Sequence, residues 1–140
     1  MSESGTLVPS SCVGKLELRN VTFSYSNREF ARILDNFSLT IQAGEVVALV
    51  GPSGSGKSSI INLFERFYDP ISGGVYIDGV SVKDLSPRYL HSKMAIVSQE
   101  PTLFARSIKD NIVYGLDEGS YTMEHIIEAG NNGCTSCFLS

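Results

Sequence analysis

The sequence predicts an α/β fold, and three observations along the chain support this class. Two stretches between Leu16 and Ile41 alternate apolar and polar residues, which is typical of strands with one buried face. Residues 46–50 (VVALV) are continuously apolar, as in a strand buried on both faces. Residues 57–67 then carry apolar side chains at helical spacing. Together these patterns predict an antiparallel sheet followed by the start of a parallel, helix-covered sheet.

The first predicted strand changes phase partway along its length. Its apolar positions alternate over 16–18 and then, in the opposite phase, over 21–25, which indicates a bulge near Arg19 and Asn20. A second alternating stretch follows at 37–41. Because each stretch has one apolar face, we expect an antiparallel pair of strands with that face on the core.

Shorter elements are predicted after residue 56 from helix caps, glycine turns and apolar spacing. The first expected elements are a helix over 57–67 ended by Asp69-Pro70, and a strand over 75–77 between Gly73-Gly74 and Asp78-Gly79. A helix capped by Ser86 and reaching about Lys93 follows, and then a buried strand over 94–97. The last two elements are a short helix capped by Ser107 and ended by Tyr114-Gly115, and a helix over 123–129 capped by Thr122 and closed by Gly130 and Asn131.

The motif GPSGSGKS at residues 51–58 lies between the apolar run and the first helix. Its glycines allow successive backbone N–H groups to turn inward, and the helix that follows directs its positive dipole end at the same point. A triphosphate fits such a cradle, with the Lys57 ammonium near its β- and γ-phosphates and the Ser58 hydroxyl on a bridging Mg²⁺. The alternative, a Gly/Ser-rich surface loop, is disfavoured by the strand before and the helix after.

Composition excludes several classes of protein. The 11 basic and 15 acidic residues give no footprint for nucleic acid. Apolar runs of about five residues are far shorter than the roughly 20 that a membrane-spanning helix needs, so we expect no span in this chain. Residues 1–14 lack the pattern of a secretory or transit peptide and are interpreted as a linker.

The cysteines and histidines give no sign of a disulfide framework or a metal site. An odd count of Cys12, Cys134 and Cys137 favours free thiols, and the Cys134-Thr-Ser-Cys137 pair has no second pair to complete a zinc tetrahedron. His91 and His125 have no ligand companion at helical spacing and are interpreted as surface residues.

Four segments together resemble the nucleotide-binding domain of ATP-binding cassette (ABC) transporters, in the exporter subfamily of multidrug, peptide and mitochondrial half-transporters. They are NVTFSYS at 20–26, ILDNFSLTIQAGEVVALVGPSGSGKSS at 33–59, FERFYDPISGGVYIDG at 64–79 and MAIVSQEPTLFARSIKDNIVYG at 94–115. The resemblance implies a P-loop NTPase fold: an antiparallel β subdomain, the first part of the parallel-sheet core and the start of the helical subdomain. It places this partial domain at 15–129, after a linker at 1–14 and before a divergent, disordered tail at 130–140.

The resemblance also implies site residues and ligands, which are ATP and Mg²⁺. Tyr25 takes the position of a ring that stacks on adenine, although a core-facing strand aromatic is the simpler interpretation of its pattern. Gln99 takes the position of a glutamine that touches Mg²⁺ or the attacking water, with a solvated loop residue as the alternative. Lys57 and Gln99 are thus the catalytic candidates, and Ser58 and Gln99 the metal ligands. The remaining nucleotide-binding candidates are Gly51, Pro52, Ser53, Gly54, Ser55, Gly56 and Ser59.

The partners implied by the resemblance are the transmembrane domain of an exporter, received near residues 101–104, and a second nucleotide-binding domain. The chain would then be membrane-associated through its parent transporter, on the cytosolic or mitochondrial matrix side. The family's Asp-Glu strand, its Leu-Ser-Gly-Gly-Gln helix start and its switch histidine have no match here, since the one Asp-Glu pair, Asp117-Glu118, follows Tyr-Gly-Leu in a predicted loop. We therefore expect an ATP-binding fragment that does not hydrolyse ATP alone, with exposed apolar edges that favour aggregation.

Two alternatives remain. One is a non-catalytic short isoform that docks on, or modulates, a full transporter. The other is a small P-loop kinase or GTPase, which is disfavoured because the chain has no Asn-Lys-x-Asp guanine reader and no arginine-rich lid.

Overall fold

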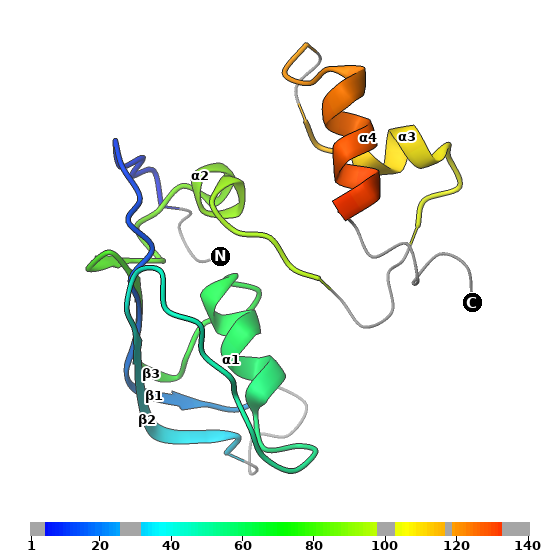
Figure 1. Ribbon diagram of the computed structural model, residues 1–140. Coiled ribbons are helices and arrows are strands. Elements are labelled where there is room, and N and C mark those ends of the chain that lie inside the picture. Colours follow the sequence, from blue (N-terminus) through cyan, green and yellow to red (C-terminus); the bar gives the residue numbers. More distant parts are fainter. Residues whose placement is uncertain (1–4, 26–31, 98–102, 117–118, 133–140) are drawn as a thin grey trace. The chain divides into compact units, whose positions relative to one another are not determined.

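The computed structural model describes residues 5–25, 32–97, 103–116 and 119–132, and these form two compact units, Met1–Ile96 and Val97–Ser140. The first unit holds a four-stranded antiparallel sheet in the order β2-β1-β3-β4 (Figure 1). Its strands are β1 (Leu16–Phe23), β2 (Leu34–Ile41), β3 (Ser72–Ile77) and β4 (Val80–Ser81). The predicted antiparallel pair is therefore confirmed, with Leu18 opposite Leu39.

The predicted bulge in β1 is also confirmed. The pairing of β1 shifts register between Leu18 and Val21 on the β2 side, and between Arg19 and Thr22 on the β3 side. Asn20 lies within the shift at a φ of 50°, a left-handed conformation that asparagine tolerates better than most residues. The bulge returns apolar side chains to the core face after the change of phase.

Helix α1 (Lys57–Phe64) lies beside the sheet (Figure 1). Its buried apolar side chains join the same core as those of the strands. The predicted end at Asp69-Pro70 is wrong by one turn, because Arg66 adopts a left-handed φ of 58° and the N–H of Phe67 donates to the Asn62 carbonyl. Phe67, predicted on the apolar face, is 60% exposed as a result. The core joins β1, β2, β3, α1 and α2 (Pro87–Ser92) through Leu18, Val21, Phe23, Leu34, Ile60, Leu63, Phe64, Val75, Ile77, Val82, Leu85 and Leu90.

Two predicted buried strands are wrong in this structure. Residues 46–50 and 94–97 belong to no strand, and Val46, Val50 and Val97 are more than 90% exposed. An apolar run is buried on both faces only where strands pair on its two sides and helices cover the sheet. In the described part of the chain, no strand pairs with either run.

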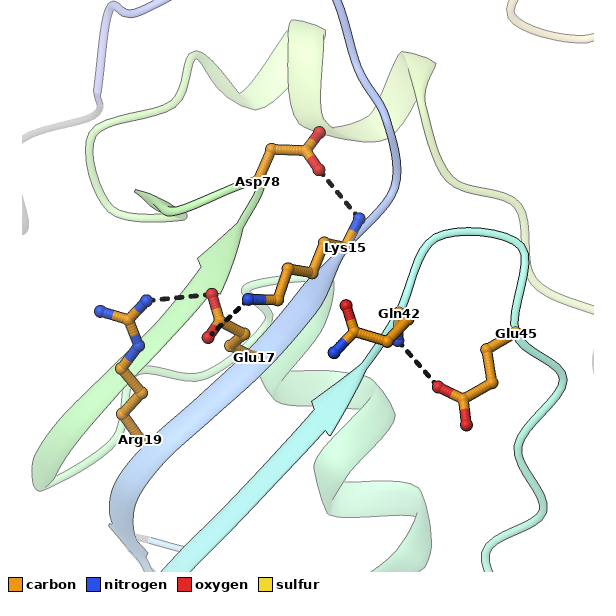
Figure 2. Close-up of polar contacts among 6 residues, drawn as sticks. All are labelled: Lys15, Glu17, Arg19, Gln42, Glu45 and Asp78. Atoms are coloured by element: carbon orange, nitrogen blue, oxygen red, sulfur yellow. Dashed lines mark hydrogen bonds and ion pairs between the residues drawn. The ribbon is translucent and has the colours of Figure 1, made fainter.

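The segment before β1 is held by one carboxylate. Asp78, in the β3–β4 turn at a φ of 51°, accepts hydrogen bonds from the backbone N–H groups of Val13, Gly14 and Lys15 at 2.8, 3.0 and 2.9 Å. Figure 2 shows the Lys15 contact. Burial alone would raise the pKa of Asp78, but these three hydrogen bonds outweigh it and the pKa lies below its ordinary value.

A second polar group lies on β1 itself. Glu17 is 8% exposed and pairs with Arg19 at 2.9 Å and with Lys15 at 3.3 Å (Figure 2). The hydrogen bond from Arg19 lowers the pKa of Glu17, with a smaller contribution from Lys15, against the opposing effect of burial. The Arg19 guanidinium also lies over the Tyr76 ring, 4.2 Å from its centroid.

Caps predicted for three short helices are present in part. Ser86 precedes α2 in extended conformation but makes no side-chain cap bond. Ser107 accepts from the Asp110 N–H at the start of α3 (Ile108–Ile112), and Thr122 accepts from the His125 N–H at the start of α4 (Met123–Asn132). Helix α4 runs on through Gly130 and Asn131 rather than closing there. No helix in the described ranges combines the length and apolar character needed to cross a membrane.

Candidate functional site

The loop at residues 51–56 joins the exposed apolar run to α1, so the predicted order of loop and helix is confirmed. Gly56 caps the helix at a φ of 88°, and a Cβ added there would lie 2.9 Å from Cγ2 of Ile33. Gly54 has a φ of 83° with no atom within 4 Å of an added Cβ. Only glycine adopts both conformations without strain, which lets the loop close against β2 and keeps its outer side open.

The loop presents backbone donors. Ser55 donates its N–H to the Pro52 carbonyl at 3.3 Å. Within the described residues, the N–H groups of Gly54, Gly56 and Lys57 have no protein acceptor. Unpaired N–H groups at a helix start carry the positive end of the helix dipole and favour an anion.

Lys57, the first residue of α1, folds its ammonium back over this loop. Its Nζ donates to the carbonyl oxygens of Gly51 and Pro52, both at 2.7 Å, and to Ser55 Oγ at 3.3 Å. The only positive side chain of residues 51–58 is thereby held against the carbonyl oxygens of its own loop. The loop thus carries both an ammonium group and unpaired N–H groups, which favours a polyanion as its ligand.

The two serines after Lys57 have different surroundings. Ser58 is exposed, so its hydroxyl is free to reach a cation carried by the ligand. Ser59 is 5% exposed, and its Oγ lies 3.0 Å from the phenol oxygen of Tyr25. The structure thus brings Tyr25, predicted as the adenine platform, to the start of the helix that follows the phosphate loop.

Tyr25 is half-buried and belongs to an aromatic cluster. Its ring centroid lies 4.9 Å from those of Phe23 and Tyr68, at interplanar angles of 78° and 85°. Neither neighbour is stacked flat against it. Asn62 donates to the phenol oxygen at 3.4 Å. Asn62 and Tyr68 were not predicted as site residues, although Asn62 follows Ser59 at the three-residue spacing that places two side chains on one helix face.

The loop also contributes to the lining of a hollow of about 510 Å³. Its lining comes from β2 and the residue before it, from the apolar run, from the loop and from α1, namely Ile33, Leu34, Asp35, Phe37, Ala48, Leu49, Val50, Gly51, Pro52, Ser55, Lys57 and Ile60. Tyr25 does not line it. Most of these side chains are apolar, and both residues 48–50 and the phosphate loop contribute to the lining.

The donor set fits Mg²⁺ only when a ligand supplies most of its oxygens. No group of three or more His, Cys, Asp or Glu side chains suited to a metal occurs among the described residues. The loop offers one exposed hydroxyl, Ser58, beside a cationic cradle, which matches a cation that enters on a phosphate chain. Gln99, the second predicted metal contact, lies outside the described residues, as do residues 101 and 102, Asp117-Glu118, Cys134 and Cys137.

The comparison with known families decides the assignment of this loop. The ABC transporter family matches residues 34–135, most of the chain. The chain belongs to the ABC transporter family. Its P-loop NTPase fold follows, and the antiparallel sheet, loop and α1 are part of the nucleotide-binding domain of such a transporter.

Several B-family members are among the proteins similar to this ABC transporter chain. It is 47% identical over 99% of its length to ABC transporter B family member 2 of Dictyostelium discoideum, and 50% identical over 83% to Multidrug resistance protein pgp-1 of Caenorhabditis elegans. It is 54% identical over 81% to ABC transporter B family member 1 of Arabidopsis thaliana. The chain spans about a tenth of each relative's length, 10%, 9% and 9% in turn.

Proposed function

We propose that this chain binds Mg-ATP through residues 51–59, as the ATP-binding portion of an ABC exporter that couples ATP hydrolysis to transport. The observation that carries the proposal is the placement of Lys57. Its ammonium lies 2.7 Å from two loop carbonyls, in the same loop whose Gly54 and Gly56 N–H groups have no acceptor among the described residues. An ammonium group and unpaired N–H groups in one loop at a helix start supply the positive charge that a triphosphate requires.

Each end of the nucleotide is assigned to different residues. The triphosphate lies on the loop from Gly51 to Ser58, and the Ser58 hydroxyl joins the shell of Mg²⁺, which neutralises phosphate charge when bound. The half-buried Tyr25 ring reads the adenine by stacking, a contact worth about 1 to 3 kcal/mol. Gln99 adds a neutral ligand to the metal or the attacking water.

Hydrolysis is not assigned to these 140 residues by themselves. In-line attack on the γ-phosphate needs a carboxylate that holds the metal's water shell and a group that orients the nucleophile. The sequence has no apolar strand ending in Asp-Glu, and the described part of the loop contributes no carboxylate. We expect binding without turnover, so steady-state ATP hydrolysis that Lys57→Ala abolishes would contradict this assignment.

Binding is tested by calorimetric titration of the full chain with Mg-ATP. Lys57→Ala should weaken binding by at least about tenfold, since it removes a charge-assisted contact to phosphate. Lys83→Ala removes the same charge from an exposed position outside the loop, and should leave the affinity unchanged. Equal affinities for the Lys57 and Lys83 variants, with matching circular dichroism spectra, would remove the proposal.

A second candidate is a docking role on a transporter, with or without nucleotide. Leu103 and Phe104 are 52% and 51% exposed, and they belong to residues 101–104, the segment that the resemblance assigns to the transmembrane partner. Partners in this proposal are that transmembrane domain and a second nucleotide-binding domain, at the cytosolic or matrix face of the membrane. Co-purification with a full transporter that Leu103→Asp and Phe104→Asp abolish would support docking, and unchanged co-purification would exclude this surface.

A further inference from the structure

The geometry points to a positioning role for Ser59 and Asn62: they hold the Tyr25 phenol, and so fix the adenine platform to the helix that follows the phosphate loop. The inference rests on the proposed function, because it concerns the orientation of the ring assigned to the base. In this inference Ser59 acts on the base of the nucleotide indirectly, by holding the Tyr25 ring. Asn62, which belongs to no recognised motif, has the same role.

The contact between Ser59 and Tyr25 is polar and buried, whereas the other buried side chains of α1 are apolar. Ser59 Oγ is 3.0 Å from the Tyr25 phenol oxygen, and Ser59 is 5% exposed. A buried hydroxyl needs a hydrogen-bond partner, and in the described part of the chain Tyr25 is the partner of this one. Asn62 donates to the same phenol oxygen at 3.4 Å, so the phenol accepts from the amide and can donate to the serine.

The position of the contact links the two ends of the site. Ser59 is two residues after Lys57 on α1, whereas Tyr25 follows the end of β1. Phe23 and Tyr68 contact the ring at steep angles and without flat stacking, so they restrict its place but leave the polar tip to set its rotation. A half-buried tyrosine without this tether would sample other rotamers before each binding event.

The test compares Mg-ATP with inorganic tripolyphosphate, which has the phosphates but no base. Tyr25→Phe keeps the ring and removes the tether, and Ser59→Ala removes the same hydrogen bond from the other side. Each should weaken Mg-ATP by about three- to tenfold relative to tripolyphosphate, the range of one lost hydrogen bond. The double variant should be no weaker than Tyr25→Phe alone, because Tyr25→Phe already removes the contacts of the phenol with both Ser59 and Asn62. Asn62→Ala should have a smaller effect of the same sign.

Conservative and matched variants separate positioning from folding. Ser59→Thr retains the hydroxyl and should recover the wild-type ratio of Mg-ATP to tripolyphosphate affinity. Ser92→Ala removes a hydroxyl from α2, where it donates to the Tyr89 carbonyl, and should leave that ratio unchanged. Recovery by threonine without a change in melting temperature would support a role in orienting the ring.

Three results would overturn the inference. Equal weakening of Mg-ATP and tripolyphosphate by Ser59→Ala would place the serine on the phosphates. Tighter Mg-ATP binding by Tyr25→Phe or Ser59→Ala would mean that the hydrogen bond holds the ring away from the base. An unchanged ratio of Mg-ATP to tripolyphosphate affinity would mean that the hydrogen bond has no effect on base binding. If these results are found but Tyr25→Ala still lowers the ratio, the role of the hydrogen bond is refuted and the role of the ring is retained. If Lys57→Ala does not weaken Mg-ATP binding, the proposed function is refuted as well.

Discussion

Replacing Asp78 by asparagine tests how one side chain anchors the segment before the sheet. The carboxylate accepts from three consecutive backbone N–H groups, those of Val13, Gly14 and Lys15, at 2.8 to 3.0 Å. Asparagine tolerates the left-handed φ of 51° at this position, so Asp78→Asn changes the acceptor and its charge with little added backbone strain. Its amide retains one acceptor oxygen and replaces the other with a donor.

The expected loss follows from the number of hydrogen bonds. A hydrogen bond to a charged group contributes roughly 1.5 to 3 kcal/mol and a neutral one about 1 kcal/mol, and partial exposure reduces both. One bond lost and the others made neutral give a decrease of about 1 to 2 kcal/mol in the free energy of unfolding. For a chain of this size, that corresponds to a melting temperature lower by roughly 3 to 8 °C.

The pH dependence has a definite sign. The pKa of Asp78 is lower in the folded chain than its ordinary value, about 3.9. Its contribution is therefore complete above that ordinary value and is lost as the pH falls through the lower, folded value. Wild type and Asp78→Asn should differ fully at pH 7 and converge in strongly acidic solution.

Hydrogen exchange measured by mass spectrometry locates the effect. The peptide containing residues 13–15 should exchange faster in Asp78→Asn at pH 7, while peptides from α1 should not change. Asp84→Asn is the matched control, because Asp84 is exposed and its contacts to Leu7 and Ser81 are made by its backbone. Unchanged exchange at residues 13–15, or an equal effect of Asp84→Asn, would refute this account of the anchor.

Four other substitutions test the loop, the apolar run and the charged group on β1. Gly56→Ala should lower the free energy of unfolding, measured by urea denaturation, by about 2 to 4 kcal/mol, because the left-handed φ and the contact of the added Cβ with Ile33 both cost free energy. Gly54→Ala should lower it by only about 1 to 2 kcal/mol, because the space around an added Cβ is open there. Equal losses would contradict the packing of the loop. Val50→Lys should change stability by less than about 0.5 kcal/mol, since Val50 is 91% exposed, and should reduce aggregation in sedimentation experiments; a large loss would show that the run is buried. Glu17→Gln should remove acid-dependent stability, because the lowered pKa of Glu17 makes its contribution present above an ordinary glutamate pKa and absent well below it; melting curves that keep the wild-type pH dependence would exclude that role.

Local pattern predicted the first antiparallel pair of the sheet, but it placed a turn at Gly73-Gly74, which belong to β3, and it did not predict β4. The change of phase near Arg19 and Asn20 located a bulge because a strand has a period of two, and a bulge is the simplest way to return apolar side chains to the core. Asp78-Gly79 located the β3–β4 turn, since both residues accept a positive φ. The Ser107 and Thr122 caps followed equally from short-range hydrogen bonding.

Long-range pairing limited the rest of the prediction. Residues 46–50 and 94–97 have the composition of buried strands, but burial depends on neighbours that composition does not supply. The end of α1 was misplaced for a related reason, since the left-handed turn at Arg66 closes the helix before the Asp69-Pro70 stop signal.

The sequence by itself determined the phosphate loop, its place before a helix and the family resemblance, because glycine spacing and the Lys-Ser pair act through local backbone geometry. Only the tertiary structure decided that the Lys57 ammonium folds onto the Gly51 and Pro52 carbonyls, and that Ser59 is turned to Tyr25. The contact of Ser59 with Tyr25 joins the start of α1 to the end of β1, and its distance depends on how the sheet and the helix pack, which no spacing along the chain encodes. The Lys57 contacts lie within one loop and depend on the folded path of that loop.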